Sequence, residues 1–138
     1  MAATIKLEIV TPEARIYSED VDMVTLPGID GEMGVFPQHV PLMTQLIAGE
    51  IVVRRNNEDF YLAVGDGFVE VTPDRVAVLT DMAVPADQID EAAAEEARKK
   101  AEARLAEIVD GEESATVQAA LARSCTLLNV HRRHPRRH

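Results

Sequence analysis

The sequence lacks tryptophan, and its aromatic residues amount to three phenylalanines and two tyrosines among 138 residues. The interior of the folded protein must therefore be built mainly from valine, leucine, isoleucine, methionine and alanine. These residues are plentiful enough for a globular core, because hydrophobic residues make up 46% of the chain. The length predicts one domain, or one domain with a small appendage.

A single cysteine, Cys125, excludes a disulfide within the chain and fits a reducing compartment. No apolar run approaches the roughly 18 residues that a membrane-spanning helix needs. The N-terminal segment also lacks the basic-then-apolar pattern of a secretory signal. We therefore expect neither a membrane span nor a secretory signal.

The net charge of −10 argues against nucleic-acid binding, which needs a basic face to displace counterions from phosphates. Basic residues gather instead in the last eight positions, HRRHPRRH, which contain four arginines and no acid. No glycine-rich phosphate-binding pattern occurs, and GDG at 65–67 does not form one. Nucleic-acid and P-loop nucleotide binding are thus not expected.

Residues 1–84 consist of short runs rich in β-branched residues, separated by turn signals. The pair Asn56-Asn57 predicts a hairpin turn, because asparagine tolerates positive φ, and Thr72-Pro73-Asp74 predicts another. The predicted strand segments are TIKLEIV, VDMVTLP, PLMTQL, EIVVRR, DFYLAV, GFVEV and RVAVLTD. Strands of this length and spacing indicate an all-β sandwich or barrel.

Beyond Pro85 the pattern becomes helical. Residues 87–109 contain neither glycine nor proline and are rich in strong helix formers, with Asp87 as the expected N-cap. The apolar stripe that we expect to be buried recurs every four residues: Ile89, Ala93, Ala97, Ala101 and Leu105, followed by Ile108.

After the break DGEES, a second helix is predicted with Ser114 as its cap. Its apolar side is expected to contain Val117, Leu121, Ser124 and Leu128. Residues 85–130 are thus predicted to form an antiparallel helix–turn–helix hairpin. Residues 131–138 are predicted to be a disordered basic tail that touches an acidic protein or anionic lipid headgroups.

The stretch GEMGVFPQHVP at 31–41 concentrates two glycines, two prolines, Glu32 and His39. Glu32 and His39 are candidates for an acid/base pair, because histidine titrates near neutrality and a carboxylate can orient it. No serine or cysteine nucleophile lies nearby in the sequence. The glycines and prolines favour instead a shaped loop that another molecule contacts, with a plain solvent-exposed turn as the alternative.

Two further candidates have simpler interpretations. Cys125 lies in a predicted helix among serine, threonine and leucine, so a structural thiol is expected rather than a nucleophile. His131, His134 and His138 have spacing that metal ligands use, but Pro135 interrupts the helix that would align them and the arginines repel a cation. We expect no metal and no cofactor.

The stretch LPGIDGEMGVFPQHVPLMTQL resembles the epsilon subunits of F-type ATP synthases, called delta in mitochondria. Gln38 and Val40 depart from the family pattern, which has glycine and alanine there, and a glycine readily adopts positive φ. The likeness covers residues 4 to about 130 and includes GEI, GDGFVEV and VAVLTD. The matching residues of the first stretch are Gly31, Glu32, Gly34, Pro37, His39, Pro41, Leu42 and Thr44.

The resemblance implies a sandwich of about ten strands followed by a two-helix hairpin, in a subunit that performs no chemistry. In the family, the β domain binds the gamma subunit and the c-ring at the foot of the central stalk. The helices fold onto the sandwich or extend toward the catalytic alpha/beta hexamer, where they inhibit ATP hydrolysis. The implied location is the cytoplasmic face of an energy-transducing inner membrane, held peripherally through the complex.

Site residues follow from the same resemblance. The loop expected to face the c-ring contains Gly31, Glu32, Gly34, Pro37 and His39. The basic residues that the resemblance implies for the regulatory helices are Arg98, Lys99, Lys100, Arg104 and Arg123.

Some family members bind ATP between the folded helices through an Ile/Leu-Asp-x-x-Arg-Ala motif and arginines of both helices. The residues that match are Ile89, Asp90, Ala94 and, on the second helix, Arg123. Ala93 occupies the position of the motif arginine, and Leu127 that of a further arginine. Because two cationic phosphate contacts are missing, weak or absent ATP binding is expected.

Two other classes stay open from the sequence. A free-standing β-sandwich adaptor for another protein would not co-purify with a gamma subunit. An enzyme built on Glu32 and His39 would show turnover as an isolated chain.

The substitution His39→Ala separates these classes. In a rotor subunit we expect it to weaken only the coupling of ATP hydrolysis to proton pumping in the assembled complex, because a preorganised docking loop loses a polar contact. Turnover of the isolated chain and pumping by the reconstituted complex are measured side by side. Turnover that vanishes in the isolated variant would establish the enzyme instead.

Overall fold

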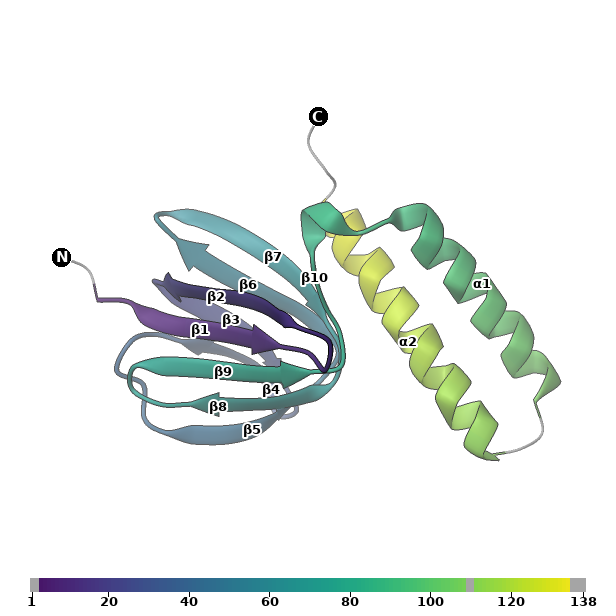
Figure 1. Cartoon of the computed structure of the whole chain (residues 1–138), viewed down its shortest axis with the longest axis horizontal. Helices are drawn as coiled ribbons and strands as arrows, with labels where there is room; N and C mark the ends of the chain where they lie inside the picture. The colour runs from purple at the N-terminus through teal and green to yellow at the C-terminus, as the bar shows by residue number, and fades with distance from the viewer. Residues whose placement is uncertain (1–2, 109–110, 135–138) are drawn as a thin grey trace.

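The computed structural model describes residues 3–108 and 111–134, and Figure 1 shows a β domain with two helices beside one end of it. The described residues form ten strands, one 3-10 turn, η1 (Ala86–Gln88), and two helices, α1 (Glu91–Glu107) and α2 (Gly111–Arg133). The strands are β1 (Ile5–Val10), β2 (Arg15–Val21), β3 (Met23–Gly28), β4 (Gly31–Val35), β5 (Leu42–Leu46), β6 (Gly49–Arg55), β7 (Glu58–Val64), β8 (Gly67–Val71), β9 (Arg75–Thr80) and β10 (Ala83–Pro85).

The strands join in the order β10-β7-β6-β3-β5-β8-β9-β1-β2, and β4 pairs with β3 beside this path. Strands β1 and β9 are parallel, whereas the other pairs of described strands are antiparallel. The sheet folds over on itself, so that Asp22 N–H donates to Arg54 O at 2.8 Å and Arg55 pairs with Glu19 at 3.7 Å. The predicted β sandwich is confirmed.

The core of the β domain is aliphatic, as the scarcity of aromatic residues requires. Alternate residues of β1, β3, β6 and β9 point inward, so each strand contributes two or three side chains. Full burial of a Val, Leu or Ile side chain contributes about 1.5–3 kcal/mol. The fully buried members with the largest side chains include Ile5, Leu7, Ile9, Leu26, Leu46, Ile51, Val21, Val24, Val35, Val53 and Val64.

The predicted strand segments are all present, and both predicted hairpin turns are confirmed. Asn56 and Asn57 adopt φ of 54° and 64° between β6 and β7, and Thr72 and Arg75 exchange backbone hydrogen bonds between β8 and β9. The short edge strand β10 and most of β2 were not predicted.

Strand β4 corrects the prediction that residues 31–41 form one loop. Residues Gly31–Val35 pair with β3, and only the segment after Val35 is a loop. Gly31 has a φ of 121°, which is accessible to glycine and lets the chain reverse after Ile29 and Asp30. Val35 is then buried in the core and Met33 packs against it.

The hairpin begins later than predicted. Residues 86–88 form the 3-10 turn, so Asp87 does not cap α1; Asp90 does, with Oδ1 accepting a hydrogen bond from Ala93 N–H at 3.0 Å. The second helix already starts at Gly111, ahead of the expected cap Ser114. Prediction of helix starts failed here because several acids and serines compete for the cap position.

The prediction of a disordered tail from residue 131 is wrong for residues 131–133, which continue α2. His131, Arg132 and Arg133 each form an ion pair with a glutamate of another element, which explains why the helix persists. Residues 135–138 lie outside the described residues.

The buried stripe of α1 also differs from the predicted one. Ala94 and Ala101 are buried seven residues apart, whereas Ala93 and Ala97 are exposed, because 3.6 residues per turn shifts a strict four-residue repeat off one face. The predicted side of α2 is confirmed: its Ser124 and Leu128 are buried.

A second, smaller cluster joins the hairpin to the β domain. Its buried members are Ala63 on β7, Ala86 and Ile89 around η1, and Val130 near the end of α2. Partly buried Tyr61, Met82, Val84 and Leu127 pack against them. The hairpin therefore rests on β6 and β7 through the end of α2, while its other end projects away (Figure 1).

Candidate partner-binding surfaces

The loop after β4 is held in a fixed shape by its backbone. Gln38 has a φ of 68°, the left-handed conformation that the family glycine would adopt without strain. Its N–H donates to Pro73 O at 2.8 Å, which ties the loop to the turn between β8 and β9. The next residue, His39, has Nδ1 at 2.7 Å from Val40 O. The loop is therefore preorganised.

The structure does not bring Glu32 and His39 together as an acid/base pair. Glu32 is exposed on β4 opposite Pro27, and His39 is half-buried in the loop after the strand. No hydrogen bond or ion pair joins them within the described residues. Pro37 lies between them in the chain, and Gly34 packs so closely that an added Cβ would lie 2.9 Å from Met23 Cε. This stretch thus has a defined backbone shape and does not form the acid/base pair.

Three apolar side chains lie on the outside of β5, β8 and β9: Met43, Phe68 and Leu79. We call them the apolar sheet face. Phe68 is opposite Leu79 in the register and diagonal to Met43, since its partner on β5 is Gln45. The three side chains are 69%, 60% and 57% exposed. Neighbouring apolar side chains exposed to this degree mark an interaction surface.

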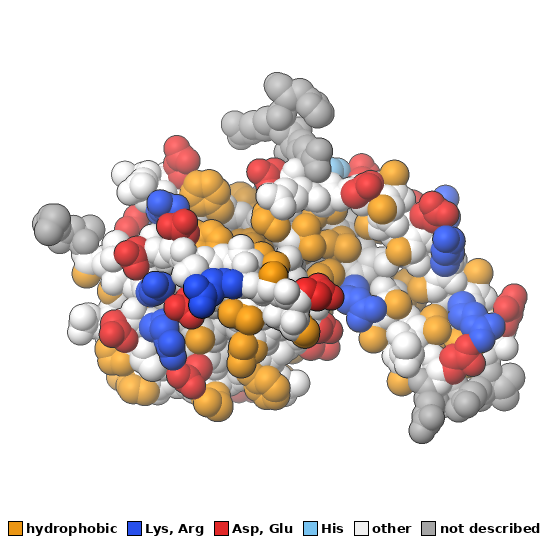
Figure 2. Space-filling model, in the orientation of Figure 1, with side chains coloured by type: hydrophobic (Ala, Val, Ile, Leu, Met, Phe, Trp, Pro, Cys, Tyr) orange, Lys and Arg blue, Asp and Glu red, His pale blue; other side chains and the backbone are white. Residues whose placement is uncertain are grey.

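Figure 2 shows apolar side chains gathered along the lower part of the β domain, where Figure 1 places β5 and β8. Phe36 and Val40, in the loop tied to the β8–β9 turn, are also exposed. The shaped loop thus lies at the β8–β9 turn and leads into β5 beside Met43, whereas Phe68 and Leu79 lie at the other end of β8 and β9.

The basic residues of the hairpin differ in how they are engaged. Arg98 bonds to Glu95 at 3.1 Å and to Glu102 at 2.7 Å, which lowers the pKa of Glu95 and raises that of Arg98. Arg104 reaches across to Glu113 on α2, and Lys100 pairs with Glu96 at 3.5 Å.

Lys99 and Arg123 are exposed, and neither forms an ion pair with another residue in ranges 3–108 and 111–134. Of the five predicted regulatory cations, these two are directly available to an outside partner in this conformation.

The residues that match the ATP motif have structural roles here. Ile89 is buried in the cluster between hairpin and β domain, Asp90 caps α1 with its carboxylate, and Ala94 is buried on α1. Arg123 is exposed on α2. The expected weakness of ATP binding stays a prediction.

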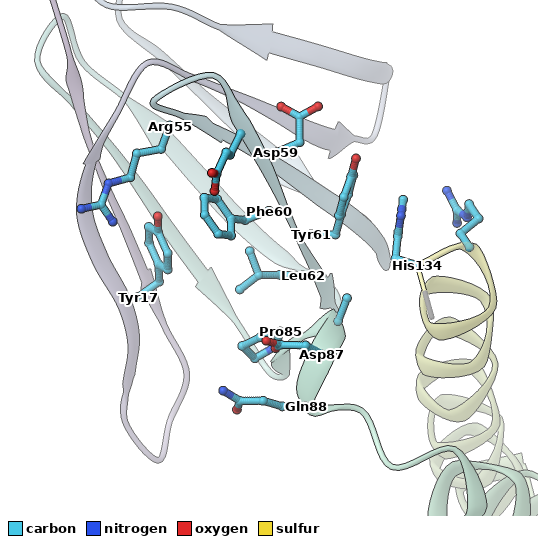
Figure 3. Close-up of a pocket in the computed structure, with 13 residues that line it drawn as sticks. Tyr17, Arg55, Asp59, Phe60, Tyr61, Leu62, Pro85, Asp87, Gln88 and His134 are labelled. Carbon is cyan, nitrogen blue, oxygen red and sulfur yellow. The ribbon is translucent and has the colours of Figure 1, made fainter. Parts of the chain in front are cut away.

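A shallow pocket lies between β7, η1 and the end of α2 (Figure 3). Tyr61 and His134 stand side by side at one end of it, with Pro85, Asp87 and Gln88 below and Arg55 with Tyr17 at the far end. Asp59 beside it accepts a hydrogen bond from Arg54 at 3.0 Å, and this bond lowers the pKa of Asp59. Sequence reasoning missed this pocket because its walls come from four separate segments.

Other candidates gain no support. No group of three or more potential metal ligands occurs among the described residues. Cys125 is half-buried in α2. None of the described helices is long and apolar enough to cross a membrane.

The structure combines a β sandwich that has an exposed apolar face with a shaped loop and a charged helical hairpin. These features are typical of the class of proteins that bind partners in an assembly. Comparisons with known proteins agree with that class. Residues 4–86 match the family model "ATP synthase, Delta/Epsilon chain, beta-sandwich domain". Residues 87–131 match "ATP synthase, Delta/Epsilon chain, long alpha-helix domain".

Curated relatives extend over nearly the whole chain. An ATP synthase epsilon chain of Dehalococcoides mccartyi is 48% identical over 96% of this chain and 98% of its own length. An ATP synthase epsilon chain 2 of Syntrophotalea carbinolica is 46% identical over 94% and 95%. A chain in the mitochondrial ATP synthase OSCP/F1/c-ring structure of Euglena gracilis superposes with a TM-score of 0.75 at 26% identity, covering 91% of this chain and 79% of that one.

The chain therefore belongs to the ATP synthase delta/epsilon chain family. It is a non-catalytic subunit of that complex, which confirms the resemblance inferred from the loop sequence.

The left-handed backbone at Gln38 predicts that Gln38→Gly stabilises the β domain. A non-glycine residue in this conformation costs about 1–2 kcal/mol, and the added chain entropy of glycine offsets about 0.5–1 kcal/mol of the gain. We expect a net increase of up to about 1 kcal/mol in the free energy of unfolding, measured by urea denaturation. Gln45→Gly, on β5, is the matched control and should destabilise; equal losses in both variants would contradict the argument.

Proposed function

We propose that this chain is a rotor subunit in the central stalk of ATP synthase, where it joins the gamma subunit to the c-ring and regulates ATP hydrolysis through its hairpin. It sits peripherally at the cytoplasmic face of the energy-transducing membrane, held by these partners. The apolar sheet face of Met43, Phe68 and Leu79 is the observation that carries the proposal, because it offers a contact area that the chain itself leaves open.

The apolar sheet face is the proposed gamma-binding surface. Its side chains project from strands that are paired on both sides, so the backbone beneath them loses little conformational freedom on docking. Aromatic and methionine side chains are enriched where interfaces are fully desolvated, and Phe68 and Met43 supply both types. A shaft that transmits torque needs such a stiff, desolvated contact.

The segment formed by β4 and the loop after it is the proposed contact with the c-ring, through Gly31, Glu32, Gly34, Pro37 and His39. Its backbone is fixed by the pairing of β4 with β3 and by the hydrogen bond from Gln38 to Pro73. Glu32 is exposed and His39 half-exposed, so both offer polar groups to the polar loops of a ring. A preorganised polar contact resists shear without requiring a large apolar area.

We assign the two functions to two units, residues 1–84 for rotor binding and 85–130 for regulation. The hairpin is folded against β6 and β7 in this structure, and its extension toward the alpha/beta hexamer would break that contact. Arg98, Lys99, Lys100, Arg104 and Arg123 then become the groups that meet acidic residues of the hexamer. The segment around η1 is the proposed hinge, since a single short turn connects the units.

The substitution of Phe68 tests the gamma-binding surface. We expect Phe68→Ser to weaken binding to the gamma subunit about tenfold or more, because a central aromatic anchor contributes at least about 1–2 kcal/mol to an interface. Affinity is measured by calorimetry with purified gamma subunit. Phe60→Ser on β7, which is also an exposed phenylalanine, is the control and should bind normally. An unchanged affinity of Phe68→Ser for the gamma subunit would show that gamma binds elsewhere on the chain.

A triple substitution tests the regulatory role of the hairpin. We expect Lys99→Gln, Lys100→Gln and Arg123→Gln together to raise ATP hydrolysis by the assembled complex several-fold, because each lost ion pair is worth up to about 1 kcal/mol of the inhibited state. Steady-state ATPase rates are compared with those of the wild type. Lys6→Gln on β1 is the matched control and should leave the rate unchanged. An unaltered rate in the triple variant would refute inhibition through these residues.

A further inference from the structure

The last turn of α2 reaches a carboxylate of the β domain that the hairpin itself covers. The side chain of Glu50, on β6, is only 10% exposed. Its Oε2 accepts a hydrogen bond from Arg133 Nη1 at 2.6 Å, and its Oε1 lies against Nε2 of His134. Oε1 is buried and makes no hydrogen bond of good geometry within the described residues. The imidazole is therefore the group placed to compensate the charge at that oxygen.

His134 is also positioned by an aromatic ring. Its imidazole stacks on Tyr61 of β7, with ring centroids 3.5 Å apart and an interplanar angle of 10°. Figure 3 shows the two rings side by side between β7 and the end of α2. A protonated imidazole gains from this arrangement twice, because it faces a carboxylate and lies over an electron-rich ring.

Of the other charged groups around the last turn of α2, some favour a positive charge on His134 and some oppose it. Asp87 on η1 lines the same pocket and favours a positive charge, and Asp59 and Glu58 on β7 line its farther part together with Arg55. Arg133 shares Glu50 with His134 and opposes a second positive charge.

On the opposite side of the turn, His131 pairs with Glu91 at 3.2 Å and Arg132 with Glu95 at 3.5 Å, both on α1. These pairs fasten α2 to α1 and not to the β domain. The contact of His134 and Arg133 with Glu50 is thus the ionic connection between hairpin and sandwich.

We propose that Glu50 and His134 form a proton-dependent latch that holds the helical hairpin against the β domain. The apolar cluster beneath the latch is small, so a change of one charge at its edge alters the balance between docked and released hairpin. Histidine is the side chain whose charge ordinarily changes between pH 5 and 8. The hairpin is docked more firmly when the proton is bound, and a rise in pH releases it.

The direction follows from linkage between the proton and the conformation. The docked state places His134 beside Glu50, whereas release exposes both side chains to water and separates them. Only the docked state can pair a protonated imidazole with this carboxylate, so loss of that proton removes a contact on which docking depends. The inference concerns the isolated chain, so it stands or falls independently of the partners proposed above.

The latch is tested by measuring the position of the hairpin in the full-length chain at pH 6 and pH 8. Spin labels are placed at Glu13→Cys, in the turn between β1 and β2, and at Ala119→Cys on α2, in a Cys125→Ser background. Double electron–electron resonance then gives the fractions of docked and released hairpin. We expect the ratio of released to docked chains to be about two- to fivefold larger at pH 8, the range for one partly exposed ion pair.

Two near-isosteric variants identify the groups responsible. His134→Gln keeps a neutral hydrogen-bond donor and Glu50→Gln keeps the size of the side chain, so both are expected to fold. In His134→Gln the released fraction at pH 6 should rise to the wild-type value at pH 8. In Glu50→Gln, which also removes the ion pair with Arg133, it should rise at least as far, and in both variants the pH dependence should disappear. His39→Gln, which removes a histidine remote from this turn in the chain, should preserve the wild-type pH dependence.

Three results would overturn the latch. They are a wild-type hairpin whose position does not change between pH 6 and 8, an unchanged pH dependence in His134→Gln, and an unchanged pH dependence in Glu50→Gln. Circular dichroism of each variant verifies that helix content is retained, so that a released hairpin is distinguished from a melted one.

Discussion

The aliphatic core of the β domain is the constraint on which the other features depend. With so few aromatic residues, the sheet must fold over until valine, leucine and isoleucine side chains from most of its strands fill one interior. Strand alternation then fixes which side chains face outward, and on β5, β8 and β9 these include Met43, Phe68 and Leu79. A rigid interior thus gives these outward-facing side chains a rigid base, as the proposed role in binding the gamma subunit requires.

The hairpin is held by a different and weaker kind of contact. Ala63, Ala86, Ile89 and Val130 bury little surface compared with the β core, and ionic contacts at the end of α2 add to them. Such a contact can be broken without disturbing the sandwich, because the two clusters share no buried residue. The fold therefore divides into a large β core and a smaller contact that holds the hairpin, and this division is compatible with the proposed separation of rotor binding from regulation.

The sequence predicted most of the strands and both helices, and it failed at identifiable places. GEMGV was predicted as loop because its glycines disfavour strands, yet pairing with β3 makes it β4. The buried stripe of α1 was misplaced, since nothing in the sequence shows which side of an alanine-rich helix faces its neighbour. Glu32 and His39 were proposed from the sequence pattern and stay a prediction, whereas the apolar sheet face was not predicted, because its members come from three strands whose order was unknown.

By itself the sequence determined which segments alternate like strands or repeat like helices, where the hairpin turn at Asn56-Asn57 lies, and to which family the chain belongs. These features depend on residues close together in the chain. Only the tertiary structure decided that β1 lies parallel to β9, which requires pairing across most of the β domain. It also decided that Arg133 and His134 meet Glu50, although Arg133 and Glu50 are 83 positions apart in the chain. In the sequence HRRHPRRH is a basic tail, and Arg133 and His134 become structural because the folded sheet offers them a carboxylate that is 10% exposed.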